Sequence, residues 1–308
     1  MIAFDPYKST PPELVKSFVC YVDILGFSQL SKEAITSSNG DVFLRKIHLA
    51  LTRAYDRVRK NSNEWSNKQR FSIKIFTDNI VVGYPIKHFT SNLGESELGH
   101  IFSVFSDFQV GLALEGFLVR GGIAFGDHYM DDEIVFGDAL LGAVNQDSAG
   151  GAPKISLAPS AVKILQHHLG FYSDPQNSPQ SQYLLEDSDN SIFVNYLERA
   201  FIAFPDAGIF FEVFEKHKKT LIEGLKKYSG NPDVRAKYEW AARYHNFVCD
   251  DFLEKNSIPT SLDVDEFYAA AVDEAQTLLE YKIDIESLAG TPSRLLLKPI
   301  LPKGSQNA

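Results

Sequence analysis

The sequence predicts an α/β or α+β fold in which helices are layered on a β-sheet. Three observations lead to this class. Short runs rich in β-branched and aromatic residues are typical of buried strands, and longer segments space their apolar residues as a helix does. The two patterns also alternate along the first half of the chain, in the order strand, helix, hairpin, helix, strand. Such alternation favours a single sheet covered by helices.

The composition is that of a globular protein with ample core. The chain has 308 residues, of which 44% are hydrophobic and 23% are charged. This length suits one large domain with an appendage, or two domains. The formal net charge of −10 argues against a general binder of nucleic acid or of anionic membranes, because such proteins carry a basic face. A local basic pocket for a phosphate ligand is compatible with it.

Cysteine usage and hydropathy predict a cytoplasmic protein. Cys20 and Cys249 are the only cysteines, and neither has a Cys or His partner at zinc-site spacing. We interpret both as buried small hydrophobes in a reducing compartment. The N-terminal segment lacks the basic and apolar parts of a signal peptide. No apolar run approaches the roughly 18 residues of a membrane span.

The first elements place two acidic residues at chain turns. After a polar lead-in, 1–16, the run Val19 to Leu25 predicts a central strand that carries Asp23 near its end. A helical pattern follows from Ser28 to Lys60. Arg70 to Tyr84 predicts a hairpin with Asp78 at its tip, where turn chemistry alone would account for an aspartate. A bare buried carboxylate costs several kcal/mol or more, so Asp23 should be paired or bound to a metal.

The next segment is rich in glycine. Leu98 to Glu115 predicts a helix, and the following strand, Val119 to Phe125, contains Gly121 and Gly122. Their spacing does not match a phosphate loop, so we interpret them as sites of close backbone approach. An acidic turn and a short strand at Ile134 to Phe136 come next. Gly137 to Asp147 then predicts a glycine turn that leads into a short helix.

The rest of the chain is predicted to be mostly helical. A helix through Leu169 and a strand at Ile192 to Leu197 complete a domain that we place at 17–200. Residues 201–308 form a helical extension, and His245 within it is interpreted as a packed residue because no ligand lies at metal spacing. The segment that starts at Pro292 is basic and broken by prolines. We expect it to be extended, either packed across a partner subunit or disordered. The helices of the extension are predicted at Phe210 to Tyr228, Val234 to Glu254 and Leu262 to Tyr281.

Four stretches together resemble a known family. YVDILGFS, IKIFTDN, VRGGIAFG and IVFGDALLGAVNQDS, in this order, are similar to the motifs of the class III nucleotide cyclase catalytic domain. Ala152 to Val162 and Lys237 to Asn246 further resemble the bacterial pyrimidine cyclases of the Pycsar antiphage systems, known as PycC. The general resemblance covers about Phe18 to Leu165, and the narrower one extends to Cys249. It implies an α+β, ferredoxin-like mixed sheet with helices on one side, followed by a C-terminal helical extension.

The resemblance implies a two-metal active site. Asp23 and Asp78 match the two metal-binding aspartates of the family, and the backbone carbonyl of Ile24 is implied as a further ligand. Oxygen ligands suit Mn²⁺ or Mg²⁺. Gly26 and Phe27 would turn the chain so that its amides meet the substrate triphosphate. Two such cations can activate the ribose 3′-hydroxyl, stabilise the α-phosphate and neutralise pyrophosphate.

Other positions depart from the purine cyclases of this class. Lys74 stands where those enzymes carry a base-reading residue, but Ile134 replaces the aspartate that completes adenine recognition. Leu141 and Asn145 replace the Asn and Arg of the transition state. We expect Arg120 to supply charge to the triphosphate and Asn145 to donate a hydrogen bond to it. Two further acids, Asp138 and Asp147, are interpreted as a start-of-helix charge and a surface charge.

The residues then favour a pyrimidine substrate. Lysine only donates hydrogen bonds, and uracil presents an acceptor where cytosine presents a donor, so Lys74 prefers UTP over CTP. The sequence-based hypothesis is a uridylate cyclase that makes cyclic UMP, read by a separate effector in antiphage defence. A cytidylate cyclase, or a catalytically silent cyclase-like domain that binds a nucleotide or a partner, is the alternative. The family resemblance implies a homodimer with active sites at its interface.

Overall fold

The chain divides into two compact units. We describe them from a computed structural model that covers residues 7, 9–64, 71–86, 94–149, 151–198, 207–256, 273–274, 276–289 and 297–300. The first unit comprises Met1–Tyr196 together with Lys298–Ala308, and the second comprises Leu197–Leu297. The sequence placed the corresponding boundary between residues 200 and 201. It assigned the final segment to the second part, whereas that segment belongs to the first unit.

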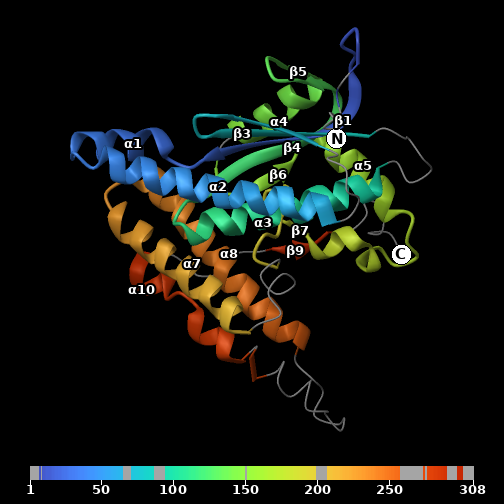
Figure 1. Cartoon of the computed structure of the whole chain (residues 1–308). Helices are drawn as coiled ribbons and strands as arrows, with labels where there is room; N and C mark the ends of the chain where they lie inside the picture. The colour runs from blue at the N-terminus through green and yellow to red at the C-terminus, as the bar shows by residue number, and fades with distance from the viewer. Residues whose placement is uncertain are drawn as a thin grey trace. The chain divides into compact units, whose positions relative to one another are not determined.

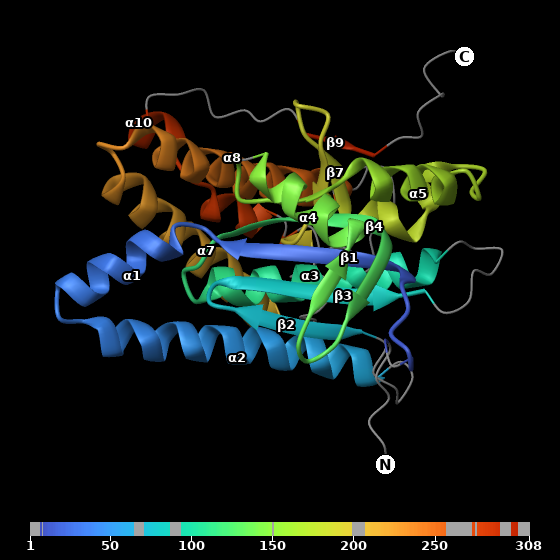
Figure 2. The same ribbon diagram turned by 90° about the horizontal axis from the view of Figure 1, so that it is seen from above.

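The first unit is built on a mixed sheet, and the α+β prediction is confirmed. Nine described strands pair in the order β2-β3-β1-β4-β6-β8-β7-β9, with β5 attached to β4. Neighbouring strands are antiparallel except for the parallel pair β4 and β6. Figure 2 shows β2, β3, β1 and β4 side by side. The strands are β1 (Val15–Ile24), β2 (Ser72–Phe76), β3 (Asn79–Pro85), β4 (Val119–Met130), β5 (Val135–Gly137), β6 (Ile155–Leu157), β7 (Leu184–Glu186), β8 (Ile192–Val194) and β9 (Lys298–Pro299).

The main core lies on one face of this sheet. Alternate residues of β1 point into it, and apolar side chains from α2, α3 and α5 close it. Helices α2 and α3 pack against each other along this face (Figure 1). The helices of the unit are α1 (Phe27–Thr36), α2 (Gly40–Glu64), α3 (Glu95–Leu114), α4 (Asp138–Ser148) and α5 (Pro159–Leu169), with short 3₁₀ turns at Pro175–Asn177 and Pro179–Gln182. The β1 residues that face this core are Phe18, Cys20, Val22 and Ile24.

A smaller core lies on the opposite face. There Val19 and Ala124 pack against Ala139 and Ala143 of α4. The expectation of helices on one side therefore holds for α2, α3 and α5 but is wrong for α4. The physical reason is that β1 is apolar on both faces at its centre, so its second face also needs a covering element. Asp23 has the same side-chain parity as Val19 and belongs to this second face.

The strand glycines let α4 approach β4, as their positions predicted. A Cβ at Gly122 would lie 2.2 Å from the carbonyl oxygen of Ala143, and one at Gly121 would lie 2.3 Å from that of Tyr21. Both distances are too short for any side chain. Gly137, with φ of 138°, ends β5 and starts α4 in a conformation that favours glycine.

The second unit is helical in its described residues. It contains α7 (Ala207–Lys227), α8 (Pro232–Asn256), a 3₁₀ turn at Leu279–Tyr281 and α10 (Ile285–Ala289). His245 is fully buried, as predicted for a packed residue, with its Nδ1 2.9 Å from Nδ1 of His217. Cys20 and Cys249 are both buried and free. None of the described helices has the length and apolar character needed to span a bilayer.

Two predictions fall partly outside the described residues. Most of the helix expected at 262–281 lies there, as does most of the tail. In the described part of the tail, Lys298–Pro299 form β9, which is extended as expected and pairs with β7 of the same chain.

Gly122→Ala tests the close approach of α4 to β4. The added methyl would meet the backbone of Ala143, so we expect a loss of about 1–3 kcal/mol in the free energy of unfolding. Gly99→Ala is the matched control, since Gly99 lies in α3 with nothing within 4 Å of its Cβ position. That change should stabilise the protein by up to about 1 kcal/mol. Chemical denaturation of both variants measures the difference, and an equal effect of the two substitutions would contradict the packing described.

Candidate functional site

The site is centred on the C-terminal end of β1, where Asp23 lies between two neighbouring strands. Its register partners are Asn79 on β3 and Arg120 on β4. Directly paired residues of antiparallel strands direct their side chains to the same face. The three side chains therefore gather on the face covered by α4. The side chain of Asp23 is only 17% exposed, so its charge needs compensation.

Asp78 joins this group from the tip of the predicted hairpin. The corner between β2 and β3 is the pair Thr77-Asp78, and Thr77 has a left-handed φ of 57°. The hydroxyl of Thr77 donates to Oδ1 of Asp78 at 2.7 Å. The side chains of Asp78 and Asp23 hydrogen-bond to each other. The structure thus brings together the two carboxylates that the sequence singled out.

Arg120 is the cation of the site. Its Nε and Nη2 both lie 3.1 Å from Oδ2 of Asp23, and Nε lies 3.4 Å from Oδ1 of Asp147. The guanidinium is 27% exposed. Arg120 is therefore held between two carboxylates, and Oδ1 of Asp23 has no contact with it among these interactions.

The carboxyl pair has an unusual proton affinity. The pKa of Asp23 is raised to about 6, chiefly by burial and then by the hydrogen bond with Asp78, while the charge of Arg120 opposes both effects. Two carboxyl groups this close favour a state in which they share a proton. The arrangement is therefore strained when both groups are charged. Removal of the proton near neutral pH leaves a doubly negative position that attracts a cation.

A tyrosine borders the carboxylates. The hydroxyl of Tyr21 donates to Oδ1 of Asn79 at 2.5 Å. Burial, followed by the charges of Asp23, Asp147 and Asp78, raises the pKa of Tyr21 to about 12. Tyr21 therefore stays neutral and orients Asn79 beside the pair. Neither residue was singled out from the sequence. Tyr21 lies two residues before Asp23 and so points to the same face, but the position of Asn79 opposite Asp23 is known only once the register of β1 and β3 is known.

The turn after β1 leads into a helix end without a side-chain cap. Gly26 has a φ of 73° and no capping side chain bonds the first amides of α1. Ile24 is buried in the main core, so only its backbone carbonyl is left to serve as a ligand. Phe27 packs against the main core and lies 6.0 Å from the ring of Phe43. Its side chain is committed to packing, and its amide is the group available to an anion.

Lys74 lies away from the pair. It stands in the middle of β2, on the far side of β3 from β1, and its Nζ is 6.0 Å from the centre of the Phe76 ring. Hydrogen bonds from the amides of Ile134 and Glu133 are the main cause of the lowered pKa of Asp131, and the charge of Lys74 contributes to it. Lys74 and Ile134 thus share the neighbourhood of the β4–β5 turn.

The outer side of α4 carries the two departures from the family pattern. Leu141 is 64% exposed, and Asn145, one turn later, is also exposed. Neither has a described contact with Asp23, Asp78 or Arg120. Within one chain, α4 therefore presents these two residues outward, and Asn145 is not brought to the predicted site.

Asp147 on the inner side of α4 was misjudged. The sequence interpretation made it a surface charge, whereas its side chain is 6% exposed and faces Arg120. Its helical position did not reveal this, because the face that α4 presents depends on the glycines of β4. Asp138 lies at the start of α4 and is exposed, as interpreted.

The donor set fits an oxygen-coordinated divalent cation. Asp23 and Asp78 supply carboxylate oxygens from one direction, and burial makes their combined charge costly without a cation. No three His, Cys, Asp or Glu side chains gather into a metal cluster within the described ranges. A cation held here would therefore need further ligands from the backbone carbonyl of Ile24, from water or from substrate phosphates.

Comparisons with known proteins show a similarity at the level of structure. No family model and no curated protein match the chain. Among solved structures, the chain is similar to the monomeric guanylyl cyclase domain of the RhoGC fusion protein from the aquatic fungus Blastocladiella emersonii. The TM-score is 0.38 and the sequence identity is 12%, over 59% of this chain and 94% of that chain. We draw no conclusion about activity from a similarity of this level.

Asp23→Asn tests the strain at the carboxyl pair. The folded-state pKa of about 6 lies above the unfolded value, so the protonated carboxyl stabilises the fold at low pH. This contribution is lost as pH rises through about 6. In metal-free buffer at neutral pH, we expect Asp23→Asn to be more stable than the parent, with the difference shrinking toward pH 4. Thermal unfolding across this pH range measures it.

The control is Asp132→Asn, because Asp132 is exposed in the β4–β5 turn. It should change stability little at any of these pH values. If Asp23→Asn is instead less stable than the parent at neutral pH, the ion pair with Arg120 outweighs the repulsion.

Proposed function

We propose that this protein is a nucleotide cyclase, which converts a nucleoside triphosphate into a cyclic nucleoside monophosphate and pyrophosphate. The observation that carries the proposal is the pair Asp23 and Asp78, held in hydrogen-bond contact beside Arg120. A protein that only binds a neutral partner has no use for two partly buried carboxylates at one position. Phosphoryl chemistry does use them, because it needs cations beside the reacting phosphate.

Two divalent cations, Mn²⁺ or Mg²⁺, are the implied cofactors. Asp23, Asp78 and the carbonyl of Ile24 would hold them. When bound, these ions lower the pKa of the attacking hydroxyl and neutralise the phosphates. The protein's own contribution is to hold the carboxylates on rigid strand ends.

The chain's own groups then position the triphosphate. The backbone amides at the start of α1 have no side-chain cap, so they can donate hydrogen bonds to an anion. The helix dipole adds to this attraction. Arg120 stands next to Asp23 with hydrogen-bonding capacity beyond its present contacts. In the reaction, the ribose 3′-oxygen forms a bond to the α-phosphorus as the bond to the β-phosphate oxygen breaks. The hydroxyl proton passes to solvent, and pyrophosphate leaves with the bonding electrons.

We infer that the substrate is a pyrimidine triphosphate, with UTP favoured and CTP as the alternative. The sequence resemblance of Ala152 to Val162 and Lys237 to Asn246 carries the choice of a pyrimidine. Lys74 then favours UTP over CTP, because an ammonium group only donates hydrogen bonds and uracil accepts them at C4. In a single chain Lys74 and Asp23 are separated by the width of β3. Lys74 would therefore read a base held at Asp23 and Asp78 of a second copy, which agrees with the proposed homodimer. Release of cyclic UMP to a separate effector in antiphage defence is the setting that the sequence resemblance implies.

Exposed apolar side chains support such a dimer. Four large ones border the face that carries Asp23, and each is at least half exposed. Leucine and phenylalanine side chains exposed on neighbouring elements are typical of interaction surfaces. A second copy that covers them would also bring Asn145 from the outer side of α4 to a substrate. The four residues are Phe76, Ile134, Phe136 and Leu141.

A silent, cyclase-like binding domain is the second candidate function. Leu141 and Asn145 favour it, because neither supplies the cation that the family places at the transition state. Arg120 is the discriminating residue. If it leaves Asp23 for the triphosphate when metal binds, the missing charge is replaced within the chain. If it stays with Asp23 and Asp147, the site binds a nucleotide without turning it over.

Incubation of the purified protein with each of the four ribonucleoside triphosphates and Mn²⁺ tests the activity. We expect cyclic UMP as the main product by chromatography, and no product from Asp78→Asn because a ligand of the cations is lost. Asp132→Asn serves as the control and should keep full turnover. A purine cyclic nucleotide as the main product would contradict the pyrimidine proposal, and no product from any substrate would favour the silent domain.

Leu141→Asp tests the proposed homodimer. A charge at this position should oppose burial against a second copy, so we expect a shift to monomer in sedimentation and at least a tenfold loss of turnover. Leu44→Asp is the matched control, because Leu44 lies on α2 and is 62% exposed, against 64% for Leu141. Dimers that persist in Leu141→Asp would place the interface elsewhere.

A further inference from the structure

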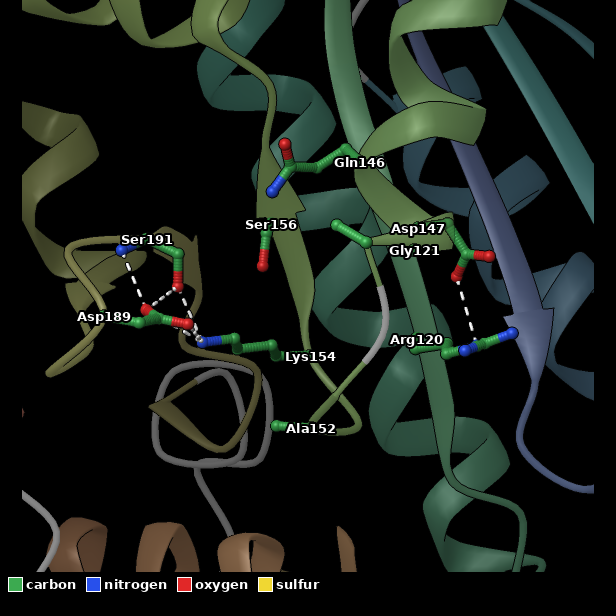
Figure 3. A pocket seen from close by; sticks show the side chains of 10 residues that line it. Arg120, Gly121, Gln146, Asp147, Ala152, Lys154, Ser156, Asp189 and Ser191 are labelled. Carbon is green, nitrogen blue, oxygen red and sulfur yellow. Dashed lines mark hydrogen bonds and ion pairs between the residues drawn. The ribbon is translucent and has the colours of Figure 1, made fainter. Parts of the chain in front are cut away.

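A polar pocket lies beside Arg120, on the side away from the hairpin tip. It has a volume of about 120 Å³ and is formed within the first unit. Four segments supply its walls, namely the start of β4, the end of α4, the segment that leads into β6, and the turn between β7 and β8. The lining residues that carry the argument are Arg120, Gln146, Asp147, Lys154, Ser156 and Asp189 (Figure 3).

The charges in this pocket compensate one another. Lys154 donates to Oδ2 of Asp187 at 2.6 Å, to Oδ2 of Asp189 at 3.1 Å and to Oγ of Ser191 at 2.6 Å. Arg120 is held by Asp23 and Asp147. Figure 3 shows Lys154 directed toward Asp189, and Arg120 directed toward Asp147. A phosphate or carboxylate would thus meet cations that are already paired, and acids that repel it. A metal ion would meet the same ammonium and guanidinium groups.

Two neutral side chains remain available to a ligand. Ser156 lies in β6 and is 5% exposed, and no described residue bonds to its hydroxyl. Gln146 lines the pocket from α4, and its amide likewise has no partner among the described residues. In Figure 3 this amide extends toward β6, where Ser156 lies. Both polar groups line the pocket, so a ligand there can exchange hydrogen bonds with them.

We propose that this pocket binds the edge of an uncharged pyrimidine base. An amide offers a donor and an acceptor side by side, and a hydroxyl offers either. Such a set complements the alternating donors and acceptors of uracil or cytosine. A volume of about 120 Å³ has room for one small ring. The choice of a pyrimidine rests on the proposed function, whereas the preference for an uncharged ligand rests on the pocket alone.

The pocket is coupled to the carboxyl pair through Arg120. Strands β1, β4 and β6 are neighbours in the sheet, so β6 lies roughly 10 Å from β1. Arg120 both lines the pocket and bonds to Asp23. Asp147, which also holds Arg120, directly follows Gln146 in α4. A ligand that engages Gln146 therefore acts on the residue that neutralises Asp23.

Ligand-observed NMR with free uracil and free cytosine, without metal or triphosphate, tests the pocket. We expect at least one base to bind, and binding to weaken about fivefold or more in Gln146→Leu and in Ser156→Ala, through loss of one hydrogen bond each. Gln176→Leu and Ser148→Ala are the matched controls at exposed positions, and both should bind as the parent does. Circular dichroism of each variant verifies folding.

A second experiment distinguishes whether the pocket binds the base of the substrate itself or a separate base. Adding 3′-deoxyuridine triphosphate and Mn²⁺ supplies a nucleotide that lacks the attacking hydroxyl. Displacement of the free base would assign the pocket to the substrate's own base, in place of Lys74. Simultaneous binding would assign it to a separate, regulatory base. Absence of binding by both free bases, or equal binding by parent and pocket variants, would overturn the proposal. Because no turnover is measured, this result is independent of the cyclase assay.

Discussion

Repulsion between Asp23 and Asp78, relieved in part by Arg120, is the constraint on which the rest of the site depends. Two carboxyl groups in hydrogen-bond contact repel each other once both are charged, and partial burial strengthens this effect. The fold withstands it because both groups sit at ends of paired strands, where the backbone is fixed by the ladder. Arg120 is the register partner of Asp23, so its stabilising charge is positioned by the same pairing. A cation that replaced Arg120 at Asp23 would release the guanidinium toward an anionic substrate.

The close packing of α4 decides which residues accompany this pair. Gly122 removes the side chain that would hold α4 away from β4, and Gly121 permits the close approach of β4 to the backbone of β1. Asp147 is thereby brought against Arg120, and Gln146 over the pocket next to it. The same packing turns Leu141 and Asn145 outward. Helix α4 thus directs polar groups toward its own sheet and an apolar side chain toward the exterior. The proposed dimer and the pocket use different sides of α4, so they are compatible.

Sequence reasoning predicted β1, the β2–β3 hairpin, β4, β5 and β8, and it singled out both aspartates, because each depends on local pattern. The short strands β6 and β7 were not predicted. Apolar runs and turn residues determine where Asp23 and Asp78 stand along the chain, and antiparallel pairing of neighbouring segments brings them together. It did not predict the burial of Asp147, the helix on the second face, or the strand that β9 adds to β7. These depend on which face of an element is covered, and on contacts between residues far apart in sequence. Lys154 belongs to the same class, because its partners Asp187, Asp189 and Ser191 follow more than 30 residues later.

Arg120 is shared by the proposed catalytic site and the proposed base pocket, so it cannot serve both fully at the same time. It has one guanidinium, shared among Asp23, Asp147 and the wall of the pocket. If a substrate phosphate draws it away, Asp147 loses the neighbouring charge of Arg120 at the position next to Gln146, and the pocket becomes more negative. A base that donates a hydrogen bond would then be favoured there. Binding at the carboxyl pair and binding in the pocket are therefore expected to be energetically linked, with the same coupling free energy in either direction.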